Sequence, residues 1–503
     1  MIRILQSKDI GRLLSPKAVR LADAEGVVRP ILEAVRKRGD RALLEYARKF
    51  DGFSRKSVRV PESELRAACS RLAPEFRGAV ETAAANIRAY AERQMPREWT
   101  VEEQPGMRLG QIVRPLDTVA AYIPSGRYPL PSTILMTVVP AQVAGVPNIC
   151  VASPRPVAEV FGTAALLGVG RVFEMGGAQA IAAFAFGTRT VPRADRIVGP
   201  GNIYVAAAKK LLAGEVGIDF VAGPTEILIV AAEGDPRWLA ADMLAQAEHD
   251  VDASAVLLTT SKKLAAAVAK EVDRQLGDLP TAAVARKAIA RNSAVVLVGS
   301  LDEAMEMANR FAPEHLSIPD ARLLANVKHA GSVFVGPHSP EAAGDYASGP
   351  NHVLPTGGAA RIRGGLAVTD YLKVISVQEL SEEALGRLGP TITTLARAEG
   401  LEAHARSVEV RVGVASKQVS EANPRVRGGP PRPSASTTTN PDRQNLGKKR
   451  PQAGVTPHAA GGTAFPTTGT EAHTHSVELR VGARARKERP QAGEAGGTAR
   501  PTT

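Results

Sequence analysis

The sequence predicts an α/β protein built on parallel, doubly wound sheets, and three observations support this fold class. Short apolar runs alternate with helix-like segments from about residue 110 onward, which is the pattern of a sheet whose crossover connections are helices. Such runs occur in two successive stretches, 118–198 and 219–335, so two sheet-forming units are expected. The 503-residue chain is also long enough to hold more than one domain.

The first hundred residues are expected to be helical. Segment 30–39 opens with Pro30 and ends with basic residues and a glycine, which is typical of a helix. Segments 65–72 and 76–92 also have helical periodicity, and Ser63 is placed to cap the first of them. These segments carry no residues that suggest chemistry, so we expect them to be scaffold.

Four short strands are expected in the first alternating unit, at 118–123, 148–152, 171–174 and 196–198. A helix capped by Ser132 should follow the first strand. Two glycine turns, 175–179 and 198–202, come directly after strands, where a backbone can approach a phosphate closely. Tight turns without a ligand would look the same, because neither has the GxGxxG fingerprint of dinucleotide-binding proteins.

The second alternating unit opens with 219–230, a turn that leads into a buried strand. Further strands are expected at 256–259, 294–298 and 332–335, with helices at 239–250, 262–276 and 301–311. Near the C-terminal side, two short helical stretches, 381–388 and 391–398, are separated by Gly389-Pro390.

Composition excludes several classes of protein. The 44% hydrophobic and 23% charged content is ordinary for a globular protein. No segment has the pattern of a secretory signal or the apolar length of a membrane span. Because Cys69 and Cys150 are the only cysteines, a disulfide framework is excluded and a cytoplasmic location is expected.

The net charge of +12 comes mostly from one end of the chain. Residues 416–503 contain fourteen Lys or Arg and six Asp or Glu, a surplus of eight positive charges. The rest of the chain is only mildly basic, which argues against a nucleic-acid-binding face on the globular part. A nucleic-acid binder acting through the basic tail stays open as an alternative, although the tail lacks interleaved aromatic residues.

Two blocks carry side chains that suit metal binding or proton transfer. Gln246 and His249 lie three residues apart in the expected helix 239–250, so they share a face and could hold a metal from two sides. Glu314 and His315 are adjacent on a segment expected to be irregular, and they can serve one site as two bases of different pKa. The end of a surface helix could carry the first pair of residues, and a surface turn the second, without any metal binding or proton transfer.

Two later blocks add further candidates. The glycine-rich stretch 344–358 is expected to be a loop, which is costly to order unless a ligand or partner holds it. Within it, Asp345 could complete a metal site as an oxygen donor, with His352 close by. The segment 399–404 places His404 after the C-terminal helical stretches.

Taken together, these blocks closely resemble the histidinol dehydrogenase family. The resemblance covers residues 1 to about 413, and its ordered set of motifs is far more specific than any single one. The matching stretches are Tyr122-Ile-Pro with Leu130-Pro-Ser-Thr, Gly176-Gly-Ala-Gln-Ala-Ile, Val198-Gly-Pro-Gly-Asn, Ala222-Gly-Pro-Thr-Glu-Ile-Leu, Gln246-Ala-Glu-His, Ala312-Pro-Glu-His-Leu, Gly344-Asp-Tyr-Ala-Ser-Gly-Pro-Asn-His-Val-Leu-Pro-Thr and Glu399-Gly-Leu-Glu-Ala-His.

The resemblance implies two Rossmann-like units, one inserted in the other, in an intertwined homodimer. The implied activity is oxidation of L-histidinol to L-histidine, a step of histidine biosynthesis, with two NAD and one zinc per site. The implied parts of the chain are an N-terminal segment (1–16), a main catalytic domain (17–121 and 225–366), an inserted NAD-contacting domain (122–224), a dimerisation segment (367–413) and a low-complexity basic tail (414–503). That tail is expected to be disordered.

The resemblance also implies a role for each matched site residue. The zinc ligands would be Gln246, His249, Asp345 and His404, with His404 completing the site of the neighbouring subunit. Glu314 and His315 match the catalytic pair, and Tyr122, Gln179 and Asn202 match the NAD contacts. Thr225, His352 and Glu399 match substrate contacts, and the substrate would also touch His315 and the zinc ligands.

Two other enzyme classes stay open. A sister dehydrogenase on the same scaffold would oxidise another small alcohol, such as sulfopropanediol, and the turn 126–129 has some features of that branch. Against it, Asp345-Tyr-Ala-Ser and Pro224-Thr-Glu-Ile look like the histidinol enzyme. A zinc hydrolase would use Glu314 as the base for a metal-bound water and would need no nicotinamide.

The tail contains repeats of earlier sequence. Segment 402–413 returns as 471–482, and 450–454 returns as 489–493. The copy carries His473 where the original has His404, so there are two candidates for one zinc ligand. We expect His404 to be the ligand because it alone follows a helical stretch.

Overall fold

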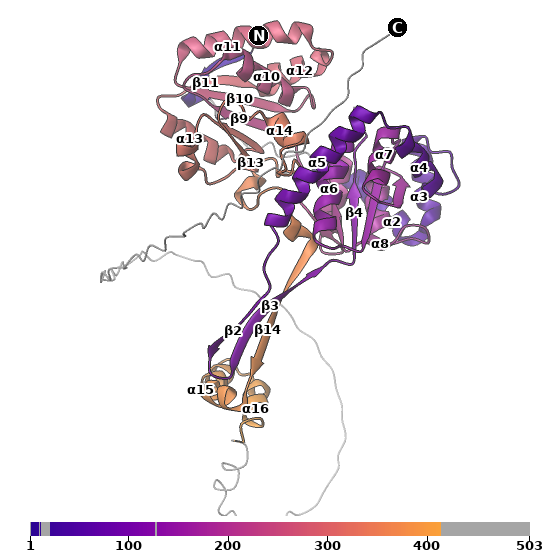
Figure 1. Ribbon diagram of the computed structural model, residues 1–503, viewed down its shortest axis with the longest axis vertical. Helices are drawn as coiled ribbons and strands as arrows, with labels where there is room; N and C mark the ends of the chain where they lie inside the picture. The colour runs from indigo at the N-terminus through magenta and orange to yellow at the C-terminus, as the bar shows by residue number, and fades with distance from the viewer. Residues whose placement is uncertain (1, 10, 12–20, 126–127, 414–503) are drawn as a thin grey trace, which may run out of the picture. The chain divides into compact units, whose positions relative to one another are not determined.

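The computed structural model describes residues 2–9, 11, 21–125 and 128–413. It confirms the predicted fold class: helices surround two parallel sheets, one of five strands and one of six, and a third sheet is antiparallel (Figure 1). Within these ranges no helix is both long and apolar enough to cross a membrane. The expectations for the tail 414–503, including His473, and for positions 126–127 concern residues outside these ranges.

The five-stranded sheet has the order β6-β5-β4-β7-β8, with every pair parallel. Its strands are β4 Thr118–Tyr122, β5 Asn148–Ser153, β6 Arg171–Glu174, β7 Arg196–Val198 and β8 Gly217–Ile218. The four strands predicted in this unit are confirmed. Only β8, which has two residues, was not predicted, because it is too short to show a strand pattern in the sequence. The surrounding helices are α2 Leu21–Arg38, α3 Asp40–Asp51, α4 Glu62–Ser70, α5 Pro74–Arg93, α6 Pro131–Val143, α7 Ala158–Leu166, α8 Gly177–Phe186 and α9 Ile203–Leu212.

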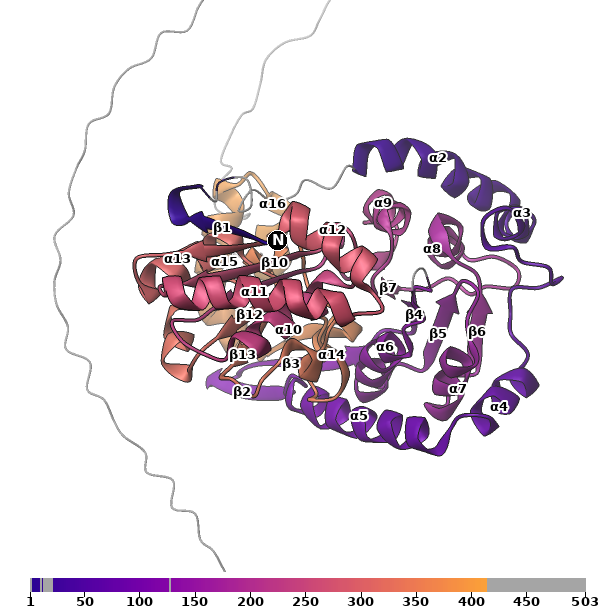
Figure 2. The same cartoon turned by 90° about the horizontal axis from the view of Figure 1, so that it is seen from above.

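Helices cover both faces of this sheet. One face packs against α2, α3, α8 and α9, and the other against α4, α5, α6 and α7 (Figure 2). Successive side chains of a strand point to opposite faces, so Ala120 and Tyr122 enter the first apolar cluster while Val119 and Ala121 enter the second. Burial on both sides explains why this strand reads as a continuous apolar run.

The six-stranded sheet has the order β1-β11-β10-β9-β12-β13. Its strands are β1 Arg3–Gln6, β9 Glu226–Val230, β10 Ser254–Thr259, β11 Ala294–Leu297, β12 His315–Ile318 and β13 Ser332–Val335. One face packs against α10 Pro236–Ala247, α11 Lys262–Asp278 and α12 Ala282–Asn292, and the other against α13 Leu301–Phe311. The predicted strands and helices of this unit are confirmed, apart from their end residues.

Strand β1 contradicts the expectation that the first hundred residues are helical. It pairs in parallel with β11, so the start of the chain forms one edge of the six-stranded sheet. Its four residues are mostly exposed and too few to give a period-two pattern.

The antiparallel sheet was not predicted. Its strands are β2 Trp99–Gln104, β3 Met107–Pro115 and β14 Leu372–Leu380, in the order β14-β3-β2. Strand β14 is followed in the chain by α15 Glu382–Ala398 and α16 Glu402–Glu409. We call the three strands and these two helices the antiparallel module. Strands β2 and β14 are exposed on both faces over most of their length, so they lack the alternation that marks a half-buried strand.

Several predicted helix boundaries are wrong, mostly at prolines. Helix α4 follows Pro61 and α6 begins at Pro131, so Ser63 and Ser132 lie inside the first turns rather than at the caps. Proline suits a first helical turn because its missing N–H has no intrahelical partner there. Pro30 lies inside α2, and α15 runs unbroken through Gly389-Pro390.

Packing explains why these helices continue through a proline. An interior proline costs about 3 kcal/mol, and α2 offsets this cost by burying an apolar stripe. In α15, Gly389 is buried and lies against Val408 of α16. The remaining short helices are α14 Glu341–Tyr346 and the 3₁₀ turns Ser7–Asp9, Ala321–Asn326, Ala359–Arg361 and Val368–Tyr371.

Candidate active site

A pocket of about 1020 Å³ is lined by residues from both parallel sheets. In the five-stranded sheet it lies at the carboxyl ends of β4 and β7, next to Pro124 and Pro200, where the strand order reverses. This switch point is the usual ligand site of a doubly wound sheet. In the six-stranded sheet the lining comes instead from the amino ends of β9 and β12, through Thr225 and Glu314.

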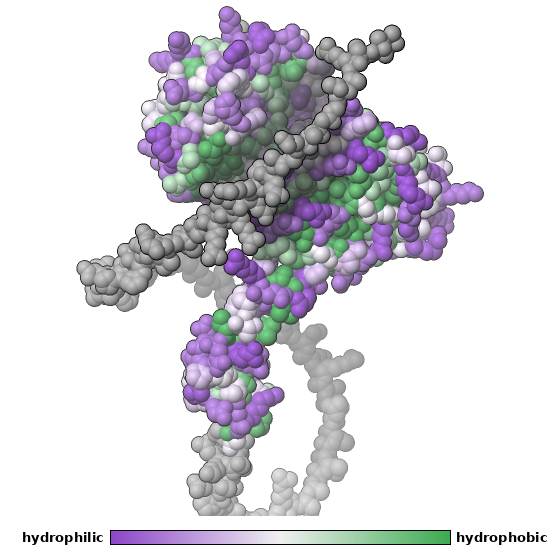
Figure 3. All heavy atoms as spheres, viewed as in Figure 1, coloured by the Kyte–Doolittle hydropathy of each residue, from purple (hydrophilic) through white to green (hydrophobic). Residues whose placement is uncertain are grey.

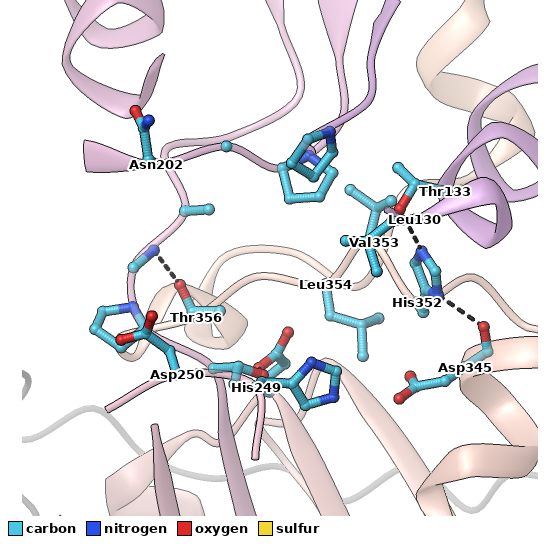
Figure 4. Close-up of a pocket in the computed structure, with 18 of the residues that line it drawn as sticks. Leu130, Thr133, Asn202, His249, Asp250, Asp345, His352, Val353, Leu354 and Thr356 are labelled. Carbon is cyan, nitrogen blue, oxygen red and sulfur yellow. Dashed lines mark hydrogen bonds between the residues drawn. The ribbon is translucent and has the colours of Figure 1, made fainter. Parts of the chain in front are cut away.

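Seven of the predicted site residues line this one pocket. Figure 4 shows His249, Asp345 and His352 around the same hollow, with Asn202 across from His249. They come from separate turns and from helix α14, so the fold, not the local sequence, brings them together. The seven are Asn202, Thr225, His249, Glu314, His315, Asp345 and His352.

Glu314 immediately precedes β12 and is buried. Strands β12 and β9 are neighbours, with His315 opposite Ile227. Glu314 therefore lies beside the start of β9, where its Oε2 accepts from the Thr225 hydroxyl at 2.5 Å and from the Glu226 N–H at 2.9 Å. Burial raises the pKa of Glu314, and His315 and these two donors oppose that rise.

His315 is the first residue of β12, not part of an irregular segment as expected. Its Nδ1 lies 3.3 Å from the Glu226 carbonyl and 3.7 Å from Glu314 Oε2, and its Nε2 lies 3.5 Å from Asp345 Oδ1. Burial by itself would lower the pKa of His315. The carboxyl groups of Glu314, Asp345 and Glu341 outweigh burial and raise this pKa to about 10.

Asp345 and His352 share a hydrogen bond through the backbone. Asp345 lies on α14, which corrects the expectation that 344–358 is a loop throughout. The Asp345 carbonyl accepts from His352 Nδ1 at 2.7 Å, and because a carbonyl only accepts, this nitrogen carries the proton. His352 Nε2 then accepts from the Thr133 hydroxyl at 3.3 Å.

The ionisation of these two side chains fits that bonding. Burial lowers the pKa of His352, which agrees with a neutral ring. For Asp345, burial opposes ionisation, but the imidazole of His315, with Nε2 at 3.5 Å, and the nearby imidazoles of His352 and His249 hold its pKa below the usual value.

Gln246 and His249 lie on either side of the end of α10. The helix ends at Ala247, so the expectation that both residues share a helical face is wrong. Gln246 is buried in the last turn, and His249 is exposed in the following turn, where it lines the pocket. With its amide turned so that donors face acceptors, Gln246 donates from Nε2 to Glu341 Oε2 at 2.9 Å. Its Oε1 accepts from the Glu226 N–H at 3.2 Å and shares the single proton of the Thr225 hydroxyl with Glu314 Oε2.

These residues fit a bound cation. The carboxyl groups of Glu314, Glu341 and Asp345 gather around His315, and a cation would stabilise their ionised forms. His249, Asp345 and Gln246 offer one nitrogen and two kinds of oxygen, a donor set that zinc accepts. In the described ranges, His, Cys, Asp and Glu side chains by themselves form no cluster of three suited to a metal. A zinc site here therefore needs the amide of Gln246 and a ligand from elsewhere.

Asn202 is the one predicted NAD contact that lines the pocket. It caps α9, where its Oδ1 accepts from the backbone N–H groups of Tyr204 and Val205 at 3.0 and 3.1 Å. The side-chain oxygen is thus occupied by the helix, and the amide N–H₂ is the group that can donate to a ligand.

Tyr122 and Gln179 form a second cluster, outside the pocket lining. The Tyr122 hydroxyl accepts from the Gly177 N–H at 3.1 Å, and burial raises the Tyr122 pKa to about 12. Gln179 donates to Asp51 Oδ2 at 3.1 Å, and the same oxygen accepts from the Gly176 N–H at 3.3 Å. Asp51 comes from the end of α3 and had no signal in the sequence.

Glu399 and His404 are not brought to the pocket within one chain. Glu399 caps α15 and His404 lies on α16, and both side chains are exposed. Figure 1 shows both helices at the far end of the antiparallel module. Neither residue belongs to the pocket lining in the described part of the chain.

Two contributors to the site have no counterpart among the residues expected from the sequence. Thr133, on α6, bonds His352, and Glu341, on α14, contacts Gln246 and lies near His315. Glu341 and Asp345 are four residues apart, a spacing that puts both on one helical face. The glycines and prolines of 344–358 favour a loop and so conceal this helical signal.

Comparison with known proteins gives one consistent result. The sequence model of the histidinol dehydrogenase family matches residues 15–412. The histidinol dehydrogenase of Geobacter sulfurreducens is 47% identical over 401 residues, covering 78% of this chain and 94% of that protein. The enzyme of Rhizobium meliloti is 46% identical over 418 residues, covering 81% and 96%. The crystal structure of histidinol dehydrogenase from Elizabethkingia anophelis matches with a TM-score of 0.79 at 34% identity, covering 82% of this chain and 98% of that one.

Proposed function

This chain belongs to the histidinol dehydrogenase family, and from that premise we propose that it oxidises L-histidinol to L-histidine with two NAD and one Zn²⁺ per active site. The observation that carries the proposal is the single pocket in which Glu314 and His315 meet Asn202, His249 and Asp345. This pocket combines two proton-transfer groups, a candidate cofactor contact and candidate metal ligands. We also expect the enzyme to act in the cytoplasm.

In the proposed mechanism His315 is the base of both oxidation steps, and a bound cation would balance the carboxyl groups that raise its pKa and so leave the imidazole neutral. It would take the hydroxyl proton of the substrate in the first oxidation, to the aldehyde, and, after releasing that proton, a proton of the hydrate in the second oxidation, to the carboxylate. Bound NAD would supply the hydride acceptor in each oxidation, two NAD for each substrate. The burial of His315 beside Glu314 supports this role, because the aldehyde would be formed away from bulk water.

Glu314 is the proposed base for the addition of water. It takes one proton from the water molecule as the oxygen bonds to the aldehyde carbon. The two donors on Oε2, from Thr225 and Glu226, support this role since they hold the carboxylate in one orientation.

We propose that Gln246, His249 and Asp345 of one subunit and His404 of the partner subunit hold the zinc ion. When bound, the ion would hold the amine and imidazole of the substrate, and its charge would balance the carboxyl groups around His315. Thr225 and His352, with Glu399 of the partner subunit, are the proposed substrate contacts. Tyr122, Gln179 and Asn202 are the proposed NAD contacts.

The surface of the antiparallel module supports a homodimer. Figure 3 shows apolar side chains on this surface, where a single chain leaves them in contact with water. Contiguous exposed apolar residues of this kind mark interaction sites. The exposed large apolar residues of the module are Trp99, Val101, Val374, Ile375, Val377, Leu380 and Leu395, and Leu401 lies between its two helices.

Product stoichiometry tests the proposed reaction. Two NADH should form for each L-histidinol consumed, and activity should disappear on treatment with a chelator and return on addition of Zn²⁺. One NADH per substrate would contradict the four-electron reaction, and full activity without metal would contradict the zinc site. Faster NAD reduction with sulfopropanediol than with histidinol would point to the sister dehydrogenase instead.

The role of Glu314 is tested by separating the two oxidations. Glu314→Gln should slow histidinol oxidation less than the oxidation of supplied histidinaldehyde, because only the second step needs added water. A general base contributes about 10²- to 10⁴-fold to a rate. Equal losses in both half-reactions would count against this role.

The source of the fourth ligand is tested by comparing the two repeated histidines. His404→Ala should abolish zinc binding, measured by metal content after dialysis, while His473→Ala should leave it unchanged. Mixing His404→Ala with a pocket variant such as His249→Ala should restore partial activity if each dimer contains one intact site. Retention of zinc by His404→Ala would contradict the assignment.

A further inference from the structure

Glu341 is a buried acid beside the active site to which the proposed reaction gives no role. It lies on α14, is 3% exposed, and precedes Asp345 by one helical turn. Asp345, Glu314 and, on α10, Asp242 lie near enough to interact with it electrostatically. A buried carboxyl group among other acids is costly to the fold, so its presence calls for a reason.

The contact between Glu341 and Gln246 supplies that reason. Gln246 Nε2 donates to Glu341 Oε2 at 2.9 Å, and Gln246 Oε1 accepts from the Glu226 N–H at 3.2 Å. The backbone N–H can only donate, so it faces the amide oxygen, and Glu341 Oε2 accepts from the amide nitrogen. These two contacts turn the amide nitrogen toward α14 and the amide oxygen toward Thr225, which lines the pocket.

The second oxygen of Glu341 shows that the carboxyl group is not there to complete a structural network. In the described part of the chain, buried Oε1 of Glu341 has no hydrogen-bond partner. Buried oxygens of this kind are rare in folded proteins, where packing alone would favour an apolar side chain. We therefore expect Glu341 to contribute more to the placement of Gln246 than to the stability of α14.

We propose that Glu341 is a positioning residue that fixes the amide of Gln246 with its oxygen presented to the metal site. The inference rests on the proposed function, since it requires Gln246 to be a ligand. A metal ion binds an amide through oxygen, and groups that orient a ligand in this way tune metal affinity. Glu341 would thus act on metal binding without touching the metal, the substrate or NAD.

The test is titration of the full-length, chelator-treated protein with Co²⁺, followed by its visible absorption bands, which report the ligand atoms. In Glu341→Gln the new amide can pair with Gln246 in either orientation, and in Glu341→Leu the pairing is lost. Loss of such an orienting partner weakens metal binding by about 10- to 100-fold, and we expect the smaller effect from Glu341→Gln. The Co²⁺ bands should change in both variants.

A matched control and a double variant separate positioning from a general loss of structure. Asp242→Asn changes a nearby, partly buried acid on α10 and leaves the Glu341–Gln246 pair in place, so its Co²⁺ bands should match the wild type. Gln246→Ala combined with Glu341→Gln should bind Co²⁺ no more weakly than Gln246→Ala alone, because the two residues act through one ligand. Circular dichroism melting curves would confirm that each variant is folded.

The outcomes distinguish this inference from the function on which it rests. Wild-type Co²⁺ affinity and bands in both Glu341 variants would overturn the positioning role and leave the metal site standing. Additive losses in the double variant would also overturn it. Absence of Co²⁺ binding by the wild-type protein would overturn the proposed metal site and, with it, this inference.

Discussion

Replacing Thr225 by valine should slow the enzyme by removing one hydrogen bond from the catalytic base. Thr225 donates to Glu314 Oε2 at 2.5 Å, and valine keeps the shape of the side chain without the hydroxyl. The Glu226 N–H would then be the remaining donor to that oxygen. A hydrogen bond to a charged group is worth about 1.5–3 kcal/mol, which corresponds to a rate loss of about 10- to 150-fold at about 1.4 kcal/mol per factor of ten.

The assay is steady-state NADH formation as a function of pH with supplied histidinaldehyde, whose oxidation needs the water that Glu314 activates. Removing a donor from an ionised carboxyl group makes the charged form less favourable, so the pKa of Glu314 should rise further. The base acts when ionised, above its pKa. The acidic limb of kcat/KM should therefore move to higher pH in Thr225→Val. Thr225→Ser keeps a hydroxyl and is the matched control, with a profile close to the wild type.

The split between kcat and KM tests the reasoning itself. If Thr225 acts by holding Glu314, kcat should fall more than KM rises. If its hydroxyl instead serves mainly as a substrate contact, KM should rise and the pH profile should stay in place. Wild-type kcat/KM in Thr225→Val, or an equal loss in Thr225→Ser, would refute the proposed hydrogen bond as a functional one.

Two further predictions concern stability. Lys209 and Asp219 form a buried ion pair, with side chains 3% and 0% exposed, beside the turn at Gly199. Lys209→Met should therefore lower the free energy of unfolding by about 3–5 kcal/mol. An unchanged urea midpoint would contradict this. Asp40 accepts from the hydroxyls of Thr188 and Thr190, which outweigh burial and lower its pKa. The stabilisation is thus present at neutral pH and lost as the pH falls below about 4, so melting curves of Asp40→Ala should differ from the wild type at pH 7 and converge in acid.

The parallel strands were the most predictable part of the fold. The predicted ranges 171–174, 196–198 and 332–335 coincide with β6, β7 and β13. These strands are buried between helices on both faces, so their sequence is a short apolar run bounded by turns. Burial of this kind leaves a local signal that does not depend on knowing the neighbouring strands.

The antiparallel module and β1 were not predictable in the same way. Strand β14 pairs with β3 across more than 250 residues, from Leu372 opposite Pro115 to Leu380 opposite Met107. Both faces of β14 are largely exposed in one chain, so its side chains show no inside and outside. The strand exists because a distant partner offers hydrogen bonds, and that information is not local.

The candidate site, like the fold, was only partly predictable from the sequence. Residue type and motif are enough to mark Gln246, His249, Glu314, His315 and Asp345 as candidates, because side chains of these kinds bind metals or move protons. Their arrangement in space has no such local signal. The six-stranded sheet presents its site residues at the amino ends of β9 and β12, whereas the common rule for such sheets points to carboxyl ends.

The sequence by itself determined most of the helices and buried strands, though not β12 or α14, and which side chains could bind a metal or move a proton, since both follow from local pattern and residue chemistry. Only the tertiary structure decided what those side chains contact. Thr225 reaches Glu314 across 89 positions of chain, and Glu341 meets Gln246 because α14 packs beside α10. The orientation of an amide and the charge around an imidazole depend on such distant neighbours, and packing alone brings them within hydrogen-bonding distance.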